Sequence, residues 1–179
     1  SIGFLRATPG AEENTVLKGD RVTLRTLQIG DYAQWSRLRA ESRAFLSPWE
    51  PRWPADDLTR MAFRRRIRRY QRDVREDDGY ALFLFLNETD ALIGGLTLAH
   101  VKRGVTQSCS LGYWMGERYA GKGYMTEAVR LAIPFVFGTL KLHRIEAACL
   151  PQNAPSIRLL EKVGFQKEGY ARRYLCING

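Results

Sequence analysis

The chain has 179 residues, 45% of them hydrophobic and 26% charged, which is typical of one globular domain and excludes a largely disordered chain. No apolar run reaches the roughly 18 residues of a membrane span, and residues 1–19 do not resemble a secretory signal. We expect residues 1–19 to be a flexible lead-in and residues 20–179 to form one domain without a membrane partner. The net charge of +9 favours anionic partners, such as a phosphate-rich cofactor, nucleic acid or the ribosome.

Cysteine and histidine are sparse. Cys109, Cys149 and Cys176 are widely spaced and form no C-x-x-C pair, and His100 and His143 are far apart in the sequence. This pattern predicts neither a disulfide framework nor a metal site. We therefore expect a reduced, cytoplasmic protein that binds no metal.

The first quarter of the chain predicts a strand, a helix and an irregular loop. Apolar and polar residues alternate over Val22–Arg25, which indicates a half-buried strand. Gly30–Asp31 opens a helix whose apolar positions are Trp35, Leu38 and Phe45. The next segment, Ser47–Pro54, holds three prolines and two tryptophans, so we expect no regular structure there.

A basic helix follows, and Asp56 or Asp57 is the predicted N-cap. Spacings of four, three and four residues predict one buried stripe, and arginines fill the other faces. This face would suit binding to an RNA-rich particle, or it is simply exposed to solvent. The stripe is Phe63, Ile67, Tyr70 and Val74, and the arginines are Arg60, Arg64, Arg65, Arg66, Arg68, Arg69 and Arg72.

Three strands come next: Tyr80–Leu86, Ala91–Val101 with a bulge at Gly94–Gly95, and Ser108–Met115. The later elements alternate between helix and strand, which predicts a mixed α/β layer fold. They are a helix over Tyr124–Phe137 that Pro134 kinks or frays, a strand over Arg144–Leu150, a helix over Asn153–Val163 that ends at a left-handed Gly164, and extended segments at Phe165–Gln166 and Ala171–Ile177.

The loop Arg118–Gly123 joins a strand directly to a helix and holds Gly121 and Gly123. Glycine lets the main chain approach a ligand closely, and the free N–H groups of a first helical turn favour an anion. Arg118 and Lys122 add formal positive charge. Taken on its own, this loop is consistent both with a pyrophosphate site and with a plain strand–helix turn. Its sequence is neither a Walker motif nor the G-x-G-x-x-G motif of dinucleotide-binding folds.

A wider match favours the pyrophosphate site. Arg118–Gly123 fits the [QR]-x-x-G-x-[GA] pattern of the GNAT superfamily of N-acetyltransferases, and Asn153–Phe165 resembles the second cofactor-contacting block of that family. The SPWEP run at residues 47–51 and KEGYARRYLCING at residues 167–179 resemble the branch that acetylates the N-terminal alanine of ribosomal proteins. The resemblance covers roughly Arg21 to Gly179 and implies a mixed, mostly antiparallel sheet flanked by helices.

By this resemblance, the strand ending at Met115 splays from Arg144–Leu150, and the pantetheine arm of acetyl-CoA lies in the gap. The main chain of Met115 and the side chain of Asn153 would bind this arm. The N–H groups of Gly121, Lys122, Gly123, Tyr124 and Met125, with the charge of Arg118, would bind the pyrophosphate.

The implied reaction is attack of a neutral amine on the thioester, helped by positioning. The Met115 N–H is the candidate donor to the oxyanion, and the Ser156 hydroxyl is the candidate donor to the leaving thiolate, with a helix-capping role as its alternative. Cys149 is expected to be a buried thiol, not a nucleophile.

The base is open. Glu146 shares strand parity with Ala148, so its carboxylate can face the site, or it can pair with Arg144 as a structural residue. Glu50 and a water chain are other candidates. Some relatives place the base on a late strand, where this chain has Leu175.

Four aromatic residues are candidates to line the acceptor pocket, namely Trp49, Trp53, Tyr113 and Trp114, although each could be an ordinary core residue. The leading prediction is acetylation of a protein N-terminus, with a small amine such as a polyamine or an antibiotic as the alternative acceptor. A non-catalytic nucleic-acid-binding module is the third alternative. Relatives usually continue past Ile177–Gly179 into another strand, so either the sequence continues or the acceptor site is more open.

Overall fold

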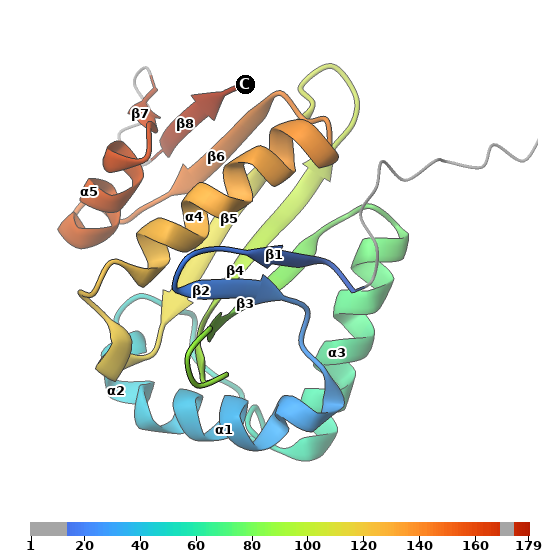
Figure 1. Cartoon of the computed structure of the whole chain (residues 1–179), viewed down its shortest axis with the longest axis vertical. Helices are drawn as coiled ribbons and strands as arrows, with labels where there is room; N and C mark the ends of the chain where they lie inside the picture. Colours follow the sequence, from blue (N-terminus) through green and yellow to red (C-terminus); the bar gives the residue numbers. More distant parts are fainter. Residues whose placement is uncertain (1–13, 169–173) are drawn as a thin grey trace, which may run out of the picture.

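A computed structural model of the chain describes residues 14–168 and 174–179. Its strands form one sheet in the order β1-β2-β3-β4-β5-β6-β8-β7, with helices on both faces (Figure 1). All neighbouring strands are antiparallel except β5 and β6. The predicted mixed, mostly antiparallel sheet flanked by helices is confirmed.

The strands follow the predicted segments closely, with one addition. Val16–Lys18, inside the expected lead-in, forms a strand paired with Val22–Arg25, while residues 1–13 lie outside the described part. The predicted segment Ala171–Ile177 also lies partly outside it. The strands are β1 (Val16–Lys18), β2 (Val22–Arg25), β3 (Tyr80–Leu86), β4 (Leu92–Lys102), β5 (Ser108–Met115), β6 (Arg144–Ala148), β7 (Gln166–Lys167) and β8 (Tyr174–Asn178).

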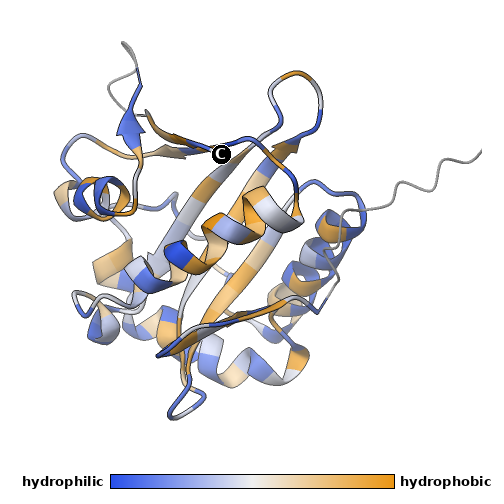
Figure 2. Ribbon diagram, turned by 45° about the horizontal axis from the view of Figure 1, so that its top comes forward, coloured by the Kyte–Doolittle hydropathy of each residue, from blue (hydrophilic) through white to orange (hydrophobic). Residues whose placement is uncertain are grey.

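Two apolar cores lie on the two faces of the sheet, and β3 explains why. Leu82 and Leu84 point into the core beneath α4, whereas Phe83 and Phe85 point into the core beneath α1 and α3. A strand buried on both faces reads as a continuous apolar run instead of an alternating one. Figure 2 shows the same hydrophobic colouring along the central strands. The helices and helical turns are η1 (Ile29–Asp31), α1 (Tyr32–Glu41), α2 (Arg43–Leu46), α3 (Arg60–Arg75), η2 (Glu117–Tyr119), α4 (Tyr124–Pro134), η3 (Phe135–Thr139) and α5 (Ala154–Lys162).

Two details of the early helices differ from the prediction. The first helix breaks at Ser42, so Phe45 lies on α2 with 38% of its surface exposed, and Leu46 is the buried residue. Helix α3 is capped by Thr59, whose side chain accepts the N–H of Ala62. Asp56 and Asp57 instead form ion pairs with arginines one to two turns into the helix, which explains why neither is free to cap it.

The glycine pair of β4 and the proline of α4 act as predicted. The register of β3 and β4 shifts by one residue next to Gly94, and a Cβ on Gly95 would lie 2.4 Å from the indole nitrogen of Trp114. Only glycine lets that indole lie against β4. Pro134 is the last residue of α4, and Leu140 N–H then bonds to Phe135 O, five residues back, at 2.9 Å. The left-handed backbone of Gly164, with φ +109°, is also confirmed.

Candidate active site

The ladder between β5 and β6 stops halfway along β5. The pairing runs from Ser108 with Arg144 to Leu111 with Ala147, whereas β5 continues to Met115 beside β4. Beyond Leu111, β5 therefore has no strand partner on its β6 side among the described residues. This is the predicted splay, and it leaves backbone N–H and C=O groups that must bond to water or to a ligand.

A groove of about 240 Å³ fills the gap between the two strands. Side chains from both faces of the sheet and from α5 line it, and no carboxylate is among these described residues. They are Trp49, Leu111, Gly112, Tyr113, Ala147, Ala148, Cys149, Leu150, Asn153, Ser156 and Leu160. A thin ligand segment that carries both apolar and hydrogen-bonding groups fits such a lining.

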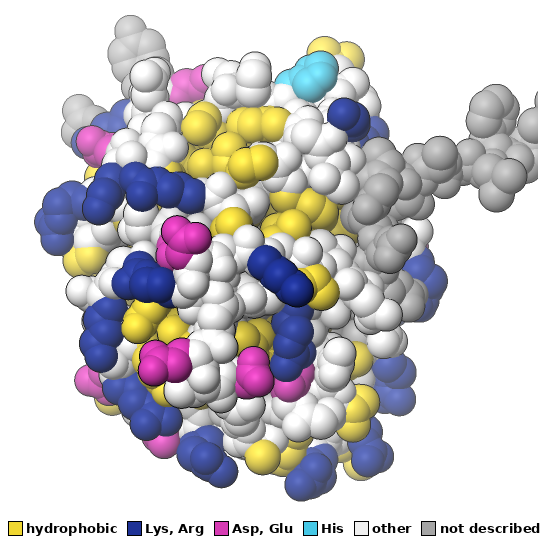
Figure 3. Space-filling view, viewed as in Figure 1, with side chains coloured by type: hydrophobic (Ala, Val, Ile, Leu, Met, Phe, Trp, Pro, Cys, Tyr) yellow, Lys and Arg dark blue, Asp and Glu magenta, His cyan; other side chains and the backbone are white. Residues whose placement is uncertain are grey.

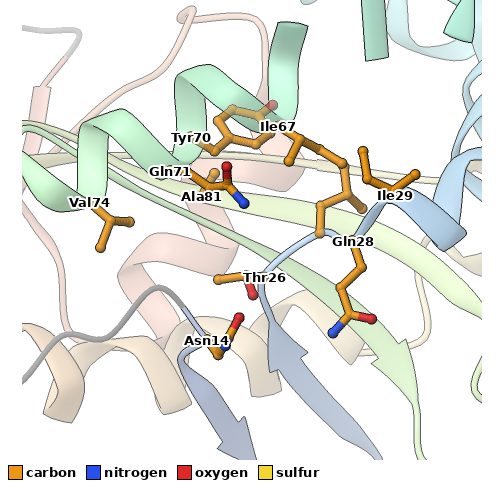
Figure 4. Close-up of a pocket in the computed structure, with 10 residues that line it drawn as sticks. Asn14, Thr26, Gln28, Ile29, Ile67, Tyr70, Gln71, Val74 and Ala81 are labelled. Atoms are coloured by element: carbon orange, nitrogen blue, oxygen red, sulfur yellow. The ribbon is translucent and has the colours of Figure 1, made fainter. Parts of the chain in front are cut away.

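A second hollow, of about 180 Å³, lies between α3 and β2, apart from this groove (Figure 4). Tyr70 and Gln71 reach it from α3, and Thr26 and Gln28 from the segment after β2. It offers no carboxylate, imidazole, thiol or cation among the described lining residues, and the Tyr70 phenol there accepts a hydrogen bond from Arg66 at 3.0 Å.

Three polar groups converge on the wall of the groove. The Ser156 Oγ atom lies 2.6 Å from the Tyr113 hydroxyl and 3.4 Å from the Cys149 Sγ atom. Asn153 caps α5 by accepting the Ser156 N–H at 3.3 Å, so the Ser156 hydroxyl is not used as a cap. Burial raises the pKa of Tyr113 to about 12, and the hydrogen bond to Ser156 opposes that shift, so the phenol stays neutral at physiological pH.

The glycine loop has the geometry of an anion site. Gly121 and Gly123 have φ values of +74° and +82°, a region that other residues enter at a cost of roughly 1–2 kcal/mol. Gly123 is the N-cap of α4 and supplies no side-chain cap. The first-turn N–H groups of α4 are therefore available to an anion, and the helix dipole favours negative charge there.

A contact with β2 holds this loop, and sequence reasoning missed it. The carboxylate of Glu127, on the first turn of α4, accepts the N–H groups of Arg21 at 3.1 Å and Val22 at 2.8 Å. The Arg21 guanidinium donates to the Lys122 carbonyl at 3.1 Å and lies 4.7 Å from the centre of the Tyr124 ring. No local motif could reveal this contact, because Arg21 and Glu127 are 106 residues apart.

The other residues predicted to bind the cofactor differ in their exposure. Arg118 and Lys122 are exposed, and Arg118 lies 3.7 Å from Glu41. Met125 is only 6% exposed, so its side chain belongs to the core and only its main chain can serve the loop. Met115 ends β5 beside Gly94, at the open end of the gap.

Both candidate carboxylates are held by arginines. Glu146 lies on the same face of β6 as Ala148, yet its carboxylate accepts from Arg144 Nε at 3.1 Å and does not line the groove. Glu50 is bound by both terminal nitrogens of Arg39, at 2.8 and 3.0 Å, and accepts the Trp53 indole N–H at 2.8 Å. Of the two interpretations of Glu146, the ion pair with Arg144 is the one the structure contains.

The four predicted aromatic residues separate into two pairs. Trp49 and Tyr113 line the groove. Trp53 and Trp114 do not; their rings lie 4.2 and 4.7 Å from the Arg39 guanidinium carbon. Arg39 thus ties the segment after α2 to the end of β5, beside the groove.

No three or more histidine, cysteine, aspartate or glutamate side chains of residues 14–168 and 174–179 gather as a metal site would require. None of the helices in these ranges is both long and apolar enough to cross a membrane.

Comparisons with known proteins agree with this geometry. Residues 21–166 match the acetyltransferase (GNAT) domain family. The chain is 40% identical to the probable N-acetyltransferase YjcK of Bacillus subtilis, covering 92% of this chain and 91% of that one. It is 34% identical to the [ribosomal protein uS5]-alanine N-acetyltransferase of Escherichia coli, covering 91% and 84%.

A solved structure is similar too. Mycobacterium smegmatis RimJ in complex with CoA-disulfide superposes with a TM-score of 0.84 and 28% identity, covering 93% of this chain and 88% of that one. The splayed strands, the glycine loop and these matches lead to one conclusion: the chain belongs to the GNAT family of N-acetyltransferases and is an acyltransferase that acts with acetyl-CoA.

Proposed function

We propose that the acceptor is the N-terminal amino group of a ribosomal protein. The observation that carries the proposal is the 34% identity to the ribosomal protein uS5 enzyme over 91% of the chain. The groove supports it. A polyamine acceptor would require carboxylates, but the described lining offers none and the net charge is +9. The enzyme would work in the cytoplasm and meet its acceptor on the ribosome.

We propose that acetyl-CoA enters with its pyrophosphate on the N–H groups of Gly121–Met125, aided by Arg118 and Lys122. The pantetheine arm would follow the gap, bonding to the free main chain of β5 at Met115 and to Asn153. The unpaired edge of β5 and the uncapped start of α4 support this path. Trp49 and Tyr113 would border the acceptor, and Glu50 would act through Arg39 to hold the Trp49 segment.

For the chemistry, we propose that Ser156 donates a hydrogen bond to the thiolate as it leaves and that the Met115 N–H stabilises the oxyanion. The position of Ser156 supports its role, because its hydroxyl faces the groove and is oriented by Tyr113. Tyr113 acts through Ser156, so it is a positioning residue.

We propose that water, and not a carboxylate, takes the proton from the acceptor. An N-terminal α-amine has a pKa near 7.7–8.0, so a substantial fraction is already neutral at neutral pH. The arginine contacts of Glu146 and Glu50 support this interpretation. We expect Glu146→Gln to keep near-normal turnover, with kcat/KM rising along the ionisation of the acceptor amine. A loss of a hundredfold or more, with a lost pH limb, would establish Glu146 as the base.

The proposed acceptor can be tested by calorimetric titration with acetyl-CoA, followed by a panel of N-terminal peptides and small amines assayed for free thiol. We expect binding in the micromolar range and thiol release with alanine-starting ribosomal-protein peptides. Release with small amines alone would move the enzyme to that class of acceptor. Binding without release from any acceptor in the panel would contradict the proposal.

A further inference from the structure

The solvent face of α3 carries a concentration of positive charge that the groove does not use. Of the 16 residues of α3, eight are arginine, none is lysine, and Asp73 is the one carboxylate. Seven of these arginines are exposed, and the six that follow Arg60 form the surface called here the α3 arginine face. It comprises Arg64, Arg65, Arg68, Arg69, Arg72 and Arg75.

Part of the helix is neutralised internally and part is not. Arg66 turns inward to Asp57, and Arg65 pairs with Asp56 at 3.0 Å on the surface. No acidic group of the described residues contacts Arg64, Arg68 or Arg72. These three are four residues apart, so they lie along one line of the helix with a rise of about 6 Å between neighbours.

Such a row is unfavourable for the free helix. Like charges four residues apart destabilise a helix by about 0.2–0.5 kcal/mol per pair. The buried stripe of Phe63, Ile67 and Val74 offsets this repulsion, because it packs against β3. A polyanion laid along the row would relieve the repulsion and release its own counterions.

The residue types favour RNA over an acidic protein. A guanidinium binds phosphate through two parallel hydrogen bonds and is more weakly hydrated than an ammonium. Stable protein interfaces need an apolar or aromatic centre, but the exposed apolar residue on this side of the helix is Met61 alone among the described residues. A face of arginines without an apolar anchor suits a phosphate backbone read without regard to sequence.

The position of α3 leaves the groove accessible. Helix α3 packs on the same face of the sheet as Trp114, over β3, and β4 separates β3 from β5. Strands lie about 4.8 Å apart, so β3, which α3 covers, is about two strand spacings from β5 at the edge of the groove. Figure 3 shows Lys and Arg side chains along the right-hand edge of the molecule, where Figure 1 places α3.

We infer that the α3 arginine face binds the phosphate backbone of RNA and, resting on the proposed function, docks the enzyme on the ribosome with its groove open to a nearby protein N-terminus. The RNA contact itself can be measured without any acceptor. Binding therefore tests the inference separately from acetylation.

The experiment is fluorescence anisotropy of the full chain with a labelled RNA duplex of mixed sequence, between about 50 and 200 mM salt. The test variant is the triple substitution Arg64→Gln, Arg68→Gln and Arg72→Gln. The matched control removes three exposed positive charges elsewhere, with Lys18→Gln, Lys102→Gln and Arg130→Gln. Circular dichroism and kcat/KM on a free peptide serve as fold and activity readouts for both variants.

We expect the slope of log K against log salt to become shallower by about 2–3 in the test variant and by less than about 1 in the control. Peptide acetylation stays unchanged in both. Equal losses in the two triple variants, or no binding of the duplex by the natural chain at the lowest salt, would overturn the inference. Ribosome association that needs the three arginines yet survives complete RNase digestion would also overturn it, in favour of a protein partner. If the test variant alone loses RNA binding and the natural chain acetylates none of the peptides, the proposed acceptor is contradicted but the RNA contact is supported.

Discussion

The two halves of the sheet differ in how completely their backbone hydrogen bonds are paired. From β1 to β4, each strand pairs with the next, and β3 is buried on both faces, with Leu84 fully enclosed. From β5 onward the ladder opens after Leu111, and the wall carries Tyr113 and Ser156 instead of aliphatic side chains alone. In the closed half, β2, β3 and β4 each have a strand partner on both sides, whereas the open half leaves backbone groups of β5 without a strand partner in the described part of the chain. Substitutions in the first should therefore cost stability, and substitutions in the second should cost activity.

The largest effect on stability should come from Leu84→Ala in the closed half. Removing a leucine side chain that is 0% exposed should lower the free energy of unfolding by about 2–5 kcal/mol. Urea denaturation measures this, and the folded fraction should keep its kcat/KM. Val105→Ala, at a fully exposed position, is the control and should change stability by less than about 0.5 kcal/mol. An activity loss in folded Leu84→Ala would mean that the halves are coupled.

The largest effect on KM for acetyl-CoA should come from Gly123→Val in the glycine loop. A β-branched residue at φ +82° is strained, and its Cβ would lie 3.3 Å from the Arg21 guanidinium. A distortion of about 1–2 kcal/mol corresponds to a rise in KM for acetyl-CoA of about tenfold. Steady-state kinetics at fixed acceptor measure it. Gly104→Val, at an open position with ordinary φ, should leave KM unchanged, and an equal rise there would refute the loop's role.

The largest effect on turnover is expected from Ser156→Ala. Losing the donor to the leaving thiolate should reduce kcat by about tenfold to a hundredfold, with little change in KM for acetyl-CoA. Cys149→Ala, 3.4 Å away in the native protein, is the comparison and should stay within about threefold of normal turnover. The opposite order, with Cys149→Ala inactive and an acetylated enzyme trapped without acceptor, would indicate a covalent mechanism.

The smallest effect is expected from Tyr113→Phe. It removes one neutral hydrogen bond to Ser156, so kcat should fall only a few-fold at neutral pH. Because the folded pKa of about 12 lies above the ordinary 10, the native protein holds this proton longer than the unfolded chain. Stability should therefore decline as pH rises from 10 to 12, and Tyr113→Phe should reduce that decline. A phenol that ionises near pH 10, seen by ultraviolet absorbance, would contradict the burial argument.

Hydrophobic periodicity and the positions of proline and glycine made much of the fold predictable. The spacing of Phe63, Ile67, Tyr70 and Val74 predicted the buried side of α3, because a helix repeats every 3.6 residues. The strand Tyr80–Leu86 was predicted with its observed bounds. The predicted disturbance of the Tyr124–Phe137 helix at Pro134 and the left-handed Gly164 after the next helix are also confirmed, since both depend on local backbone chemistry.

Other features could not be predicted from the sequence, either because several residues gave equivalent local signals or because the feature depends on long-range contacts. Asp56, Asp57 and Thr59 are all good N-caps, and the choice of Thr59 reflects the ion pairs that occupy the two aspartates. The cluster of Tyr113 with Ser156 needs two elements 43 residues apart. Strand β1 is only three residues long and half exposed, so its sequence carried no clear alternation.

The bridge from Glu127 to the start of β2 has a consequence for folding. The glycine loop is held by a partner 106 residues away, so it can be completed only after a long-range contact has closed. On the ribosome, β2 emerges early and must wait for α4 to be synthesised. Affinity for acetyl-CoA should therefore be acquired late, once Arg21 and Glu127 have met, and pulse-labelled refolding would detect it after most secondary structure has formed.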